Sequence, residues 1–311
     1  MLLPILISRR KGKILILSYH RVLPKTHPEY IKMQPGMVVS DETFRKHLTW
    51  LSHYLKFARL LDVNKYCNKN QEPVCIITID DGWVDNYKYA FPILKELNTP
   101  ATIFLVSNMI DTENYFWPEK LGLLLDDKNT KKLLITYIKE NYGSELTGSI
   151  DYDALIELLK SKSDATIIEI LKVVEKEAIK VGSEFCSSRQ VLNLNELVEM
   201  KQSGLIDYGS HTANHVRLDK VNATEVAQEL TGSKKQLETL LKEDIVTFCY
   251  PNGSYTPEVL NAVSNIYELA CTTDKGWVDD KNKKYALKRI LLHDDVSNTQ
   301  SLFWGRVLGV F

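Results

Sequence analysis

Two adjacent carboxylates end a strongly apolar stretch of this chain. Residues 74–79 are apolar or β-branched apart from Cys75, which is typical of a buried strand. Asp80, Asp81 and Gly82 follow at once. Ionised carboxylates in such a place need compensation for their lost hydration, and a metal ion, a polar substrate or a tight turn would each supply it. Because Asp-Gly is a common turn pair, a simple chain reversal is the alternative interpretation.

A second set of potential ligands lies far downstream. The apolar residues before Ser210 predict another strand, and His211 and His215 follow it. The two histidines are four residues apart, so they fall on one side if the chain there makes a helical turn. Two imidazoles and one carboxylate are a common three-ligand set that leaves one coordination position open for water. A lone histidine is more often a core or surface residue, but a spaced pair matched by an acidic strand end favours a metal site.

These two motifs together resemble those of the polysaccharide deacetylases, also called the NodB-homology or carbohydrate esterase 4 family. Residues 78–82 (TIDDG) are similar to the family's T-F-D-D-G motif, and residues 211–215 (HTANH) to its H-[ST]-x-x-H motif. Supporting similarities occur at residues 18–22 (SYHRV), 248–253 (FCYPNG) and 291–294 (LLHD). The resemblance spans about residues 13–310. It implies an irregular TIM-like (β/α) barrel with fewer than eight full units.

The resemblance and the residue types together assign roles to the two motifs. Asp81, His211 and His215 would hold a divalent cation, with Zn²⁺ as the first expectation and Co²⁺, Ni²⁺, Mn²⁺ or Fe²⁺ also admitted by the ligand set. Asp80, adjacent but not a ligand, would act as general base toward a water molecule. The two aspartates take separate directions if the alternation of the strand persists to that point.

Two histidines compete for the role of general acid. His293 matches the family's final L-x-H motif, whose histidine protonates the leaving amine. His20 ends the predicted strand 13–20, and strand ends at the carboxyl face of a barrel are where catalytic groups collect. A histidine satisfied by local hydrogen bonds is the alternative interpretation for His20. We favour His293.

The remaining candidate residues lie near the ends of two later strands. The family commonly has arginine where this chain has Cys249, so Arg289 is the candidate to orient Asp80 from another strand, with a surface ion pair as its alternative. Tyr250 and Asn252 lie in a loop held by proline and glycine, and such a loop can direct a backbone N–H at developing negative charge.

Strand-like and helix-like segments alternate along most of the chain. Strands are predicted at 101–106, 205–210 and 245–250, and helices at 40–55, 86–97, 195–203, 223–241 and 301–311. This alternation favours α/β architecture with a parallel sheet. Residues 273–277 are predicted to be a loop. Residues 112–190 contain helical patterns and no strong strand, so we predict one domain over 1–311 with a helical insertion at 112–190.

Composition limits the partners and the compartment. The 39 basic and 40 acidic residues nearly cancel, so no global field attracts nucleic acid. Five scattered cysteines without a C-x-x-C spacing suggest reduced thiols and a cytoplasmic protein. The apolar residues 1–7 precede their basic neighbours, the reverse of a secretory signal, and are too few to span a bilayer. Contact with a membrane surface stays open, and the sequence does not reveal the oligomeric state.

The expected function is removal of an N-acetyl group from an amino sugar of a glycan or glycan precursor by a metal-dependent hydrolase. A deformylase or O-deacetylase would use the same residues on another acyl group. A non-catalytic carbohydrate-binding protein would keep the fold with a defective site, and the cysteine at position 249 is the sequence feature that points in that direction. The intact Asp80, Asp81, His211 and His215 point away from it.

Overall fold

The computed structural model describes residues 3–32, 34, 36–67, 71–142, 152–183, 185, 189–279 and 283–310. The chain divides into two compact units. The first comprises Met1–Thr112 and Val191–Phe311, and the second is Glu113–Gln190.

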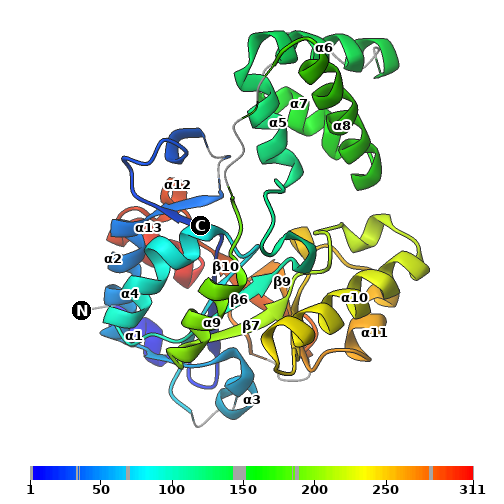
Figure 1. The fold of residues 1–311 in the computed structure, drawn as a ribbon. Helices are drawn as coiled ribbons and strands as arrows, with labels where there is room; N and C mark the ends of the chain where they lie inside the picture. The colour runs from blue at the N-terminus through cyan, green and yellow to red at the C-terminus, as the bar shows by residue number, and fades with distance from the viewer. Residues whose placement is uncertain are drawn as a thin grey trace. The chain divides into compact units, whose positions relative to one another are not determined.

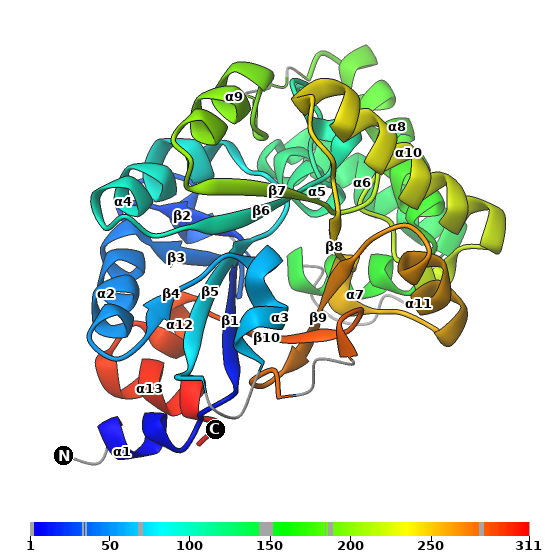
Figure 2. The same ribbon diagram turned by 90° about the horizontal axis from the view of Figure 1, so that it is seen from below.

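The first unit is built on a closed parallel barrel of seven strands (Figures 1 and 2). In spatial order these strands are β1 (Ile14–Tyr19), β10 (Leu287–Leu291), β9 (Leu269–Lys275), β8 (Thr247–Cys249), β7 (Ile206–Ser210), β6 (Ala101–Leu105) and β5 (Val74–Ile79). Pairing of β5 with β1 closes the ring, from Ile14 opposite Val74 to Tyr19 opposite Ile79. The short β4 (Lys56–Phe57) pairs with the start of β5. Seven strands rather than eight make this the irregular TIM-like barrel that the family resemblance implies.

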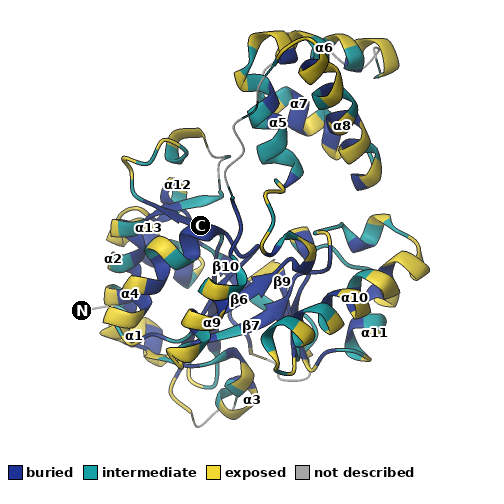
Figure 3. Ribbon diagram, viewed as in Figure 1, coloured by how far each residue is buried: buried dark blue, intermediate teal, exposed yellow. Residues whose placement is uncertain are grey.

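Strand alternation separates two apolar cores. Alternate residues of the barrel strands, such as Ile14 and Ile16 of β1 or Val74 and Ile76 of β5, belong to one buried cluster that also includes Phe104. The intervening residues join a larger cluster with residues of the surrounding helices. Every residue of β1, β5 and β6 is accordingly buried, and Figure 3 colours the ribbon by this burial. Side chains alternate along a strand, so every second residue points into the barrel. The same alternation decides which residues just after each strand face the site.

Helices surround the barrel. They are α1 (Leu3–Ser8), α2 (Asp41–Ser52), α3 (Val63–Tyr66), α4 (Phe91–Glu96), α9 (Leu194–Gln202), α10 (Ala223–Leu241), α11 (Pro257–Ser264), α12 (Asp294–Ser297) and α13 (Gln300–Leu308). The Ser40 side chain accepts a hydrogen bond from the Thr43 backbone N–H and begins α2, as its sequence predicts. The short strands β2 (Arg21–Leu23) and β3 (Val38–Ser40) pair with each other next to the barrel.

Two predicted segments differ from the structure. The helix expected over 86–97 begins as a π-helical turn, Asn86–Ala90, and continues as α4. Pro92 has no N–H for the Lys88 carbonyl, and the Phe91 N–H bonds to the Asn86 carbonyl five residues back. The loop predicted over 273–277 is wrong in its first half, because Thr273 to Lys275 belong to β9. The exposed polar end of that strand concealed it.

The second unit is helical, with α5 (Trp117–Asp126), α6 (Lys128–Tyr142), α7 (Tyr152–Lys160) and α8 (Asp164–Lys180). One apolar cluster joins the four helices, with Leu121 and Leu124 from α5 and Ile167 and Ile170 from α8 among its members. Within the described parts of both units, no helix is long and apolar enough to cross a membrane. Among the described residues, Cys75, Cys249 and Cys271 are free thiols, and Cys186 lies outside the described residues.

Candidate functional site

The chain turns sharply where β5 ends, and this turn separates the two aspartates. The Asp80 N–H bonds to the Tyr19 carbonyl at 2.9 Å, so Asp80 keeps the strand's interior parity. Asp81 and Gly82 then both adopt left-handed backbone conformations, each with φ of 73°. The alternation therefore stops after Asp80, and the left-handed turn orients Asp81. A Cβ at Gly82 would lie 2.7 Å from the Leu105 side chain, so only glycine fits this turn without movement.

The two histidines converge through an irregular loop rather than a helical turn. His211 follows β7 directly, and Thr212 and His215 have φ of 67° and 58°. Glu229 of α10 fixes the loop, because its carboxylate accepts hydrogen bonds from the Ala213 and Asn214 N–H groups, both at 2.9 Å. The two imidazole rings lie 4.9 Å apart between centroids. The convergence anticipated from the four-residue spacing is present, but its cause differs.

Three side chains surround a common point. His211 Nε2 and His215 Nε2 each lie 3.4 Å from Asp81 Oδ1, and the three groups form a potential cation site. With metal–ligand bonds of about 2.1 Å and tetrahedral angles, two ligand atoms are separated by about 3.4 Å. Asp81 Oδ1 is buried, and no group among the described residues donates a hydrogen bond to it. The spacing of the three ligand atoms, their chemical types and the unsatisfied Asp81 Oδ1 therefore all fit a small divalent cation.

Neighbouring hydrogen bonds orient these ligands. His211 Nδ1 lies 2.7 Å from the Cys249 carbonyl oxygen, which fixes the ring with Nε2 turned toward Asp81. The Trp83 indole N–H donates to Asp81 Oδ2 at 2.9 Å. Burial alone would raise the pKa of Asp81, but its histidine neighbours outweigh burial and hold that pKa well below its usual range. Asp81 is therefore a carboxylate at neutral pH.

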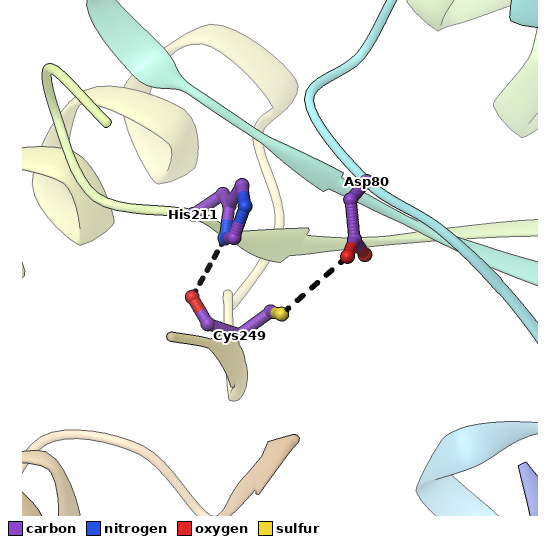
Figure 4. A group of neighbouring side chains, drawn as sticks. All are labelled: Asp80, His211 and Cys249. Atoms are coloured by element: carbon purple, nitrogen blue, oxygen red, sulfur yellow. Dashed lines mark hydrogen bonds between the residues drawn. The ribbon is translucent and has the colours of Figure 1, made fainter. Parts of the chain in front are cut away.

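A second group of potential ligands shares His211 and includes Asp80 and Cys249 (Figure 4). Both Asp80 oxygens already accept hydrogen bonds from Arg289, and an Arg289 nitrogen lies 3.0 Å from the Cys249 sulfur. Burial raises the pKa of the Cys249 thiol well above its usual value, so the sulfur stays protonated. A guanidinium cation in contact with two of the three groups disfavours a metal ion here. The better candidate for a cation site is therefore the group of Asp81, His211 and His215.

Arg289 of β10 holds Asp80 in a bidentate ion pair. Its two terminal nitrogens donate to the two carboxylate oxygens, both at 2.7 Å. Thr78 Oγ1 and the Thr272 carbonyl accept further hydrogen bonds from the same guanidinium, at 3.0 and 2.9 Å. Burial would raise the pKa of Asp80, but Arg289 outweighs it and lowers that pKa. Asp80 is thus ionised and fixed in orientation, and the residue that fixes it comes from the strand predicted to supply it.

The two candidate general acids occupy different surroundings. His20 Nε2 lies 3.9 Å from Oδ2 of Asp80, the candidate general base. His293 Nδ1 lies 3.0 Å from Asp295 Oδ2. Burial lowers the pKa of His293, Asp295 partly offsets the effect, and the charges of Arg306 and His20 add to the lowering. A histidine with a carboxylate partner on one nitrogen is oriented to donate from the other, which favours His293.

The loop after β8 contains the two residues predicted to contact substrate. In this turn Tyr250 and Gly253 use their N–H groups in hydrogen bonds to the Cys271 and Tyr250 carbonyls, and Pro251 has none, so the remaining N–H is that of Asn252. Asn252 has φ of 55°. The structure places Tyr250 differently from the prediction, because its ring packs in the outer core and its hydroxyl bonds to the Tyr285 carbonyl at 3.0 Å. Its side chain therefore does not reach a substrate.

Gly253→Ala is expected to destabilise the protein and displace this loop. Gly253 has φ of 72°, and a Cβ there would lie 2.6 Å from the Thr273 backbone nitrogen, so strain and overlap together should cost about 2–5 kcal/mol of unfolding free energy. Gly204→Ala is the matched control, because Gly204 has φ of 71° with nothing within 4 Å of the added Cβ. Denaturant unfolding of both variants tests this, and equal losses would show that the overlap with Thr273 has no effect.

Three residues that support the site were not singled out by sequence reasoning. Trp83 binds Asp81, Glu229 fixes the histidine loop, and Asp295 orients His293. Trp83 and Asp295 are each two residues from a predicted site residue, which is a signal that could have been used. The sequence around Glu229 contains no such indication, because Glu229 lies within α10 and reads as one of the ordinary charged residues on the exposed face of a helix.

Comparison with known proteins identifies the family of this chain. The sequence profile described as polysaccharide deacetylase matches residues 68–136 and 155–267, more than half of the chain and both predicted ligand motifs. The chain therefore belongs to the polysaccharide deacetylase family, as its TIDDG and HTANH motifs suggest.

Individual relatives are distant in sequence but similar over most of the chain. Poly-beta-1,6-N-acetyl-D-glucosamine N-deacetylase of Staphylococcus epidermidis is 26% identical over 75% of this chain and 83% of its own length. Among solved structures, the deacetylase PplD of Streptococcus pyogenes in complex with acetate covers 94% of this chain and 97% of its own, with 21% identity and a TM-score of 0.61. A polysaccharide deacetylase of Bacillus cereus covers 95% of this chain and 69% of its own, with 19% identity and a TM-score of 0.62. These structures share the fold.

Proposed function

We propose that this protein is a metal-dependent N-deacetylase that removes acetyl groups from amino sugars of a glycan or glycan precursor. The observation that carries the proposal is the arrangement of Asp81, His211 and His215 around one point, with the ionised Asp80 beside them. Family membership supports the reaction class. The N-acetylglucosamine polymer named for the staphylococcal relative supports the substrate class.

The ligand set supplies the electrophilic half of the reaction. A cation held by Asp81, His211 and His215 would lower the pKa of a bound water toward neutrality and polarise the acetyl carbonyl. Two neutral nitrogen ligands and one carboxylate suit Zn²⁺ and also Co²⁺, Ni²⁺, Mn²⁺ or Fe²⁺. In the free protein, burial alone would lower the pKa of His211, but Asp81 and Asp80 outweigh burial and raise it. Binding of the cation therefore displaces a proton from His211, and the affinity of the site for the cation falls at low pH.

The neighbouring residues carry the proton transfers. Asp80 takes the proton of the attacking water, and Arg289 holds its two oxygens so that one geometry persists through the reaction. The Asn252 N–H is placed in this proposal as a donor to the oxygen that becomes negative. His293, oriented by Asp295, gives a proton to the amine as the acetyl group leaves.

The substrate carrier follows from the compartment, which stays a prediction. The cysteine pattern predicts a cytoplasmic protein, and a cytoplasmic enzyme would act on a precursor rather than on a finished external polymer.

Metal analysis combined with acetate release tests the function. The purified protein should contain one divalent metal ion per chain, and it should release acetate from N-acetylglucosamine oligomers. A chelator should abolish this release, and added Zn²⁺ or Co²⁺ should restore it. Formyl and O-acetyl analogues assayed in parallel separate the deformylase and O-deacetylase alternatives. A metal-loaded protein that binds the oligomers without releasing any acid would instead be the non-catalytic carbohydrate-binding protein.

The pH profile of the reaction should depend on Asp295. Because Asp295 raises the pKa of His293 against the effect of burial, Asp295→Asn should lower that pKa further. A general acid must be protonated, so the alkaline limb of kcat/KM should move to lower pH in this variant. His293→Gln should lower kcat by about 10²–10⁴-fold and remove the limb. If His20→Gln removes the limb and His293→Gln does not, His20 is the acid.

A further inference from the structure

Asp81 accepts a hydrogen bond from an aromatic side chain, Trp83, that has no role in the proposed reaction. The Trp83 indole N–H donates to Asp81 Oδ2 at 2.9 Å, and the Trp83 residue is 1% exposed. The other oxygen, Oδ1, is the one that faces both histidine Nε2 atoms. The two oxygens of the Asp81 carboxylate therefore differ: Oδ2 accepts the hydrogen bond from Trp83, and Oδ1 faces the candidate cation site.

Arg21 lies on the face of the same indole ring. Its guanidinium carbon is 4.4 Å from the Trp83 ring centroid, and the residue is 1% exposed. Arg21 is itself fixed, with Nε donating to Asp85 Oδ2 at 2.7 Å and Nη2 lying 2.8 Å from Glu29 Oε2. A positive charge over the ring draws electron density from the indole and strengthens its N–H as a donor.

Asp85 also joins the two chain segments that contain these residues. Its second oxygen accepts a hydrogen bond from the Val22 N–H at 2.9 Å, and the Asn86 side chain donates to the His20 carbonyl at 2.9 Å. The SYHRV segment, which begins at the end of β1, is thereby fixed against the DDGWVDN turn after β5. His20 aside, the sequence motif at 18–22 had no role in the reaction proposed above, and this contact gives it one.

We propose that Trp83, supported by Arg21, is a positioning residue that presents Asp81 to the cation through one oxygen only. The inference rests on the proposed function, because it concerns the same cation. A carboxylate free to rotate could offer both oxygens or turn away from the histidines. The indole N–H blocks both outcomes, and the buried ion pair behind the ring keeps the indole from moving. Outer partners of this kind typically change metal affinity by about 10–100-fold.

Zinc binding to the metal-free protein tests the proposal. Trp83→Phe keeps an aromatic ring and removes the N–H, so the dissociation constant for Zn²⁺, measured by competition with a chromophoric chelator, should rise by about 10–100-fold. Arg21→Lys should also weaken Zn²⁺ binding, but it should add no further loss in the Trp83→Phe background, because Arg21 acts through the indole.

The chain contains a closely matched control in Trp277. Its indole N–H donates to the Val307 carbonyl at 2.8 Å, and the Arg10 guanidinium carbon lies 5.3 Å from its ring centroid. Trp277→Phe therefore removes the same kind of hydrogen bond beneath the same kind of cation, next to the chain's C-terminal helix. It should leave Zn²⁺ affinity unchanged. Equal weakening in both variants would show general destabilisation and overturn the proposal.

A second variant decides the matter if Trp83→Phe does not fold. Benzothienylalanine at position 83, introduced by nonsense suppression, keeps the shape and the ring face of tryptophan and replaces only the N–H by sulfur. Its Zn²⁺ affinity should fall as for Trp83→Phe, and an affinity equal to that of the wild type refutes the inference. If the wild-type protein binds no Zn²⁺ or other divalent metal stoichiometrically, the proposed function fails first. If the wild type binds and the variants bind equally well, only the inference about Trp83 fails.

Discussion

Asp80→Asn is expected to leave the protein loaded with metal and almost without activity. The amide cannot accept a proton from water, and loss of a positioned general base typically reduces turnover by about 10²–10⁴-fold. Asp80 is not one of the three ligand residues, so metal content should stay at one ion per chain. Acetate release and elemental analysis on the same preparation measure both quantities.

The substitution also disturbs a buried ion pair, and a control must separate that effect. Asparagine offers only one oxygen to the two Arg289 nitrogens that now bond to Asp80. Asp207→Asn breaks an aspartate–arginine pair that is more exposed, because Asp207 Oδ2 lies 2.7 Å from an Arg59 nitrogen near the start of β7, at the opposite end of the barrel from His211. Asp207→Asn should lower stability and keep turnover. Full activity in Asp80→Asn, or an equal loss in both variants, would contradict the role of Asp80 as base.

His211→Ala is expected to remove both the metal and the activity. The substitution leaves Asp81 and His215 as two ligands, too few for a tight site, and it empties a position that is 2% exposed. Acetate release should fall to the level of the chelator-treated wild type. Adding excess Zn²⁺ should not restore it, whereas the same addition should restore the chelated wild type.

His47→Ala controls for the loss of a buried imidazole. His47 is completely buried, its Nε2 bonds to the Ser297 carbonyl at 2.7 Å, and its ring stacks on Phe303 away from the ligand set. Truncation there should lower the melting temperature and leave one metal ion per chain. If His211→Ala keeps its metal and its turnover, the Asp81 site is not the metal centre.

Local patterns in the sequence were sufficient to predict the strands and the groups at their ends. The strand predicted over 74–79 has the bounds of β5, and the helix predicted over 223–241 has those of α10. The strand is a continuous apolar or β-branched run, the helix has apolar residues at helical spacing, and both have clear end signals, with Asp80 directly after the strand and Asn222 capping the helix. Arg289 could be anticipated because Cys249 left Asp80 without its usual partner.

The features that sequence reasoning missed depend on contacts between distant segments. The conformation at 211–215 is fixed by Glu229 and by pairing with the chain after β6, so spacing alone suggested a helical turn that is absent. The Tyr250 ring lies outside the barrel because side chains alternate between inside and outside along the preceding strand. The loop motif does not reveal which of its residues face inward. The end of β9 escaped prediction since its residues 273–275 are exposed and polar.

The ion pair between Asp80 and Arg289 joins residues 209 positions apart in the chain. Arg289 lies on β10, the strand that completes the ring between β9 and β1. Without that strand, Asp80 has no guanidinium beside it and has neither its orientation nor its lowered pKa. The arrangement of the site therefore depends on closure of the ring: Asp81 and His211 follow β5 and β7, but the residue that fixes Asp80 comes from β10.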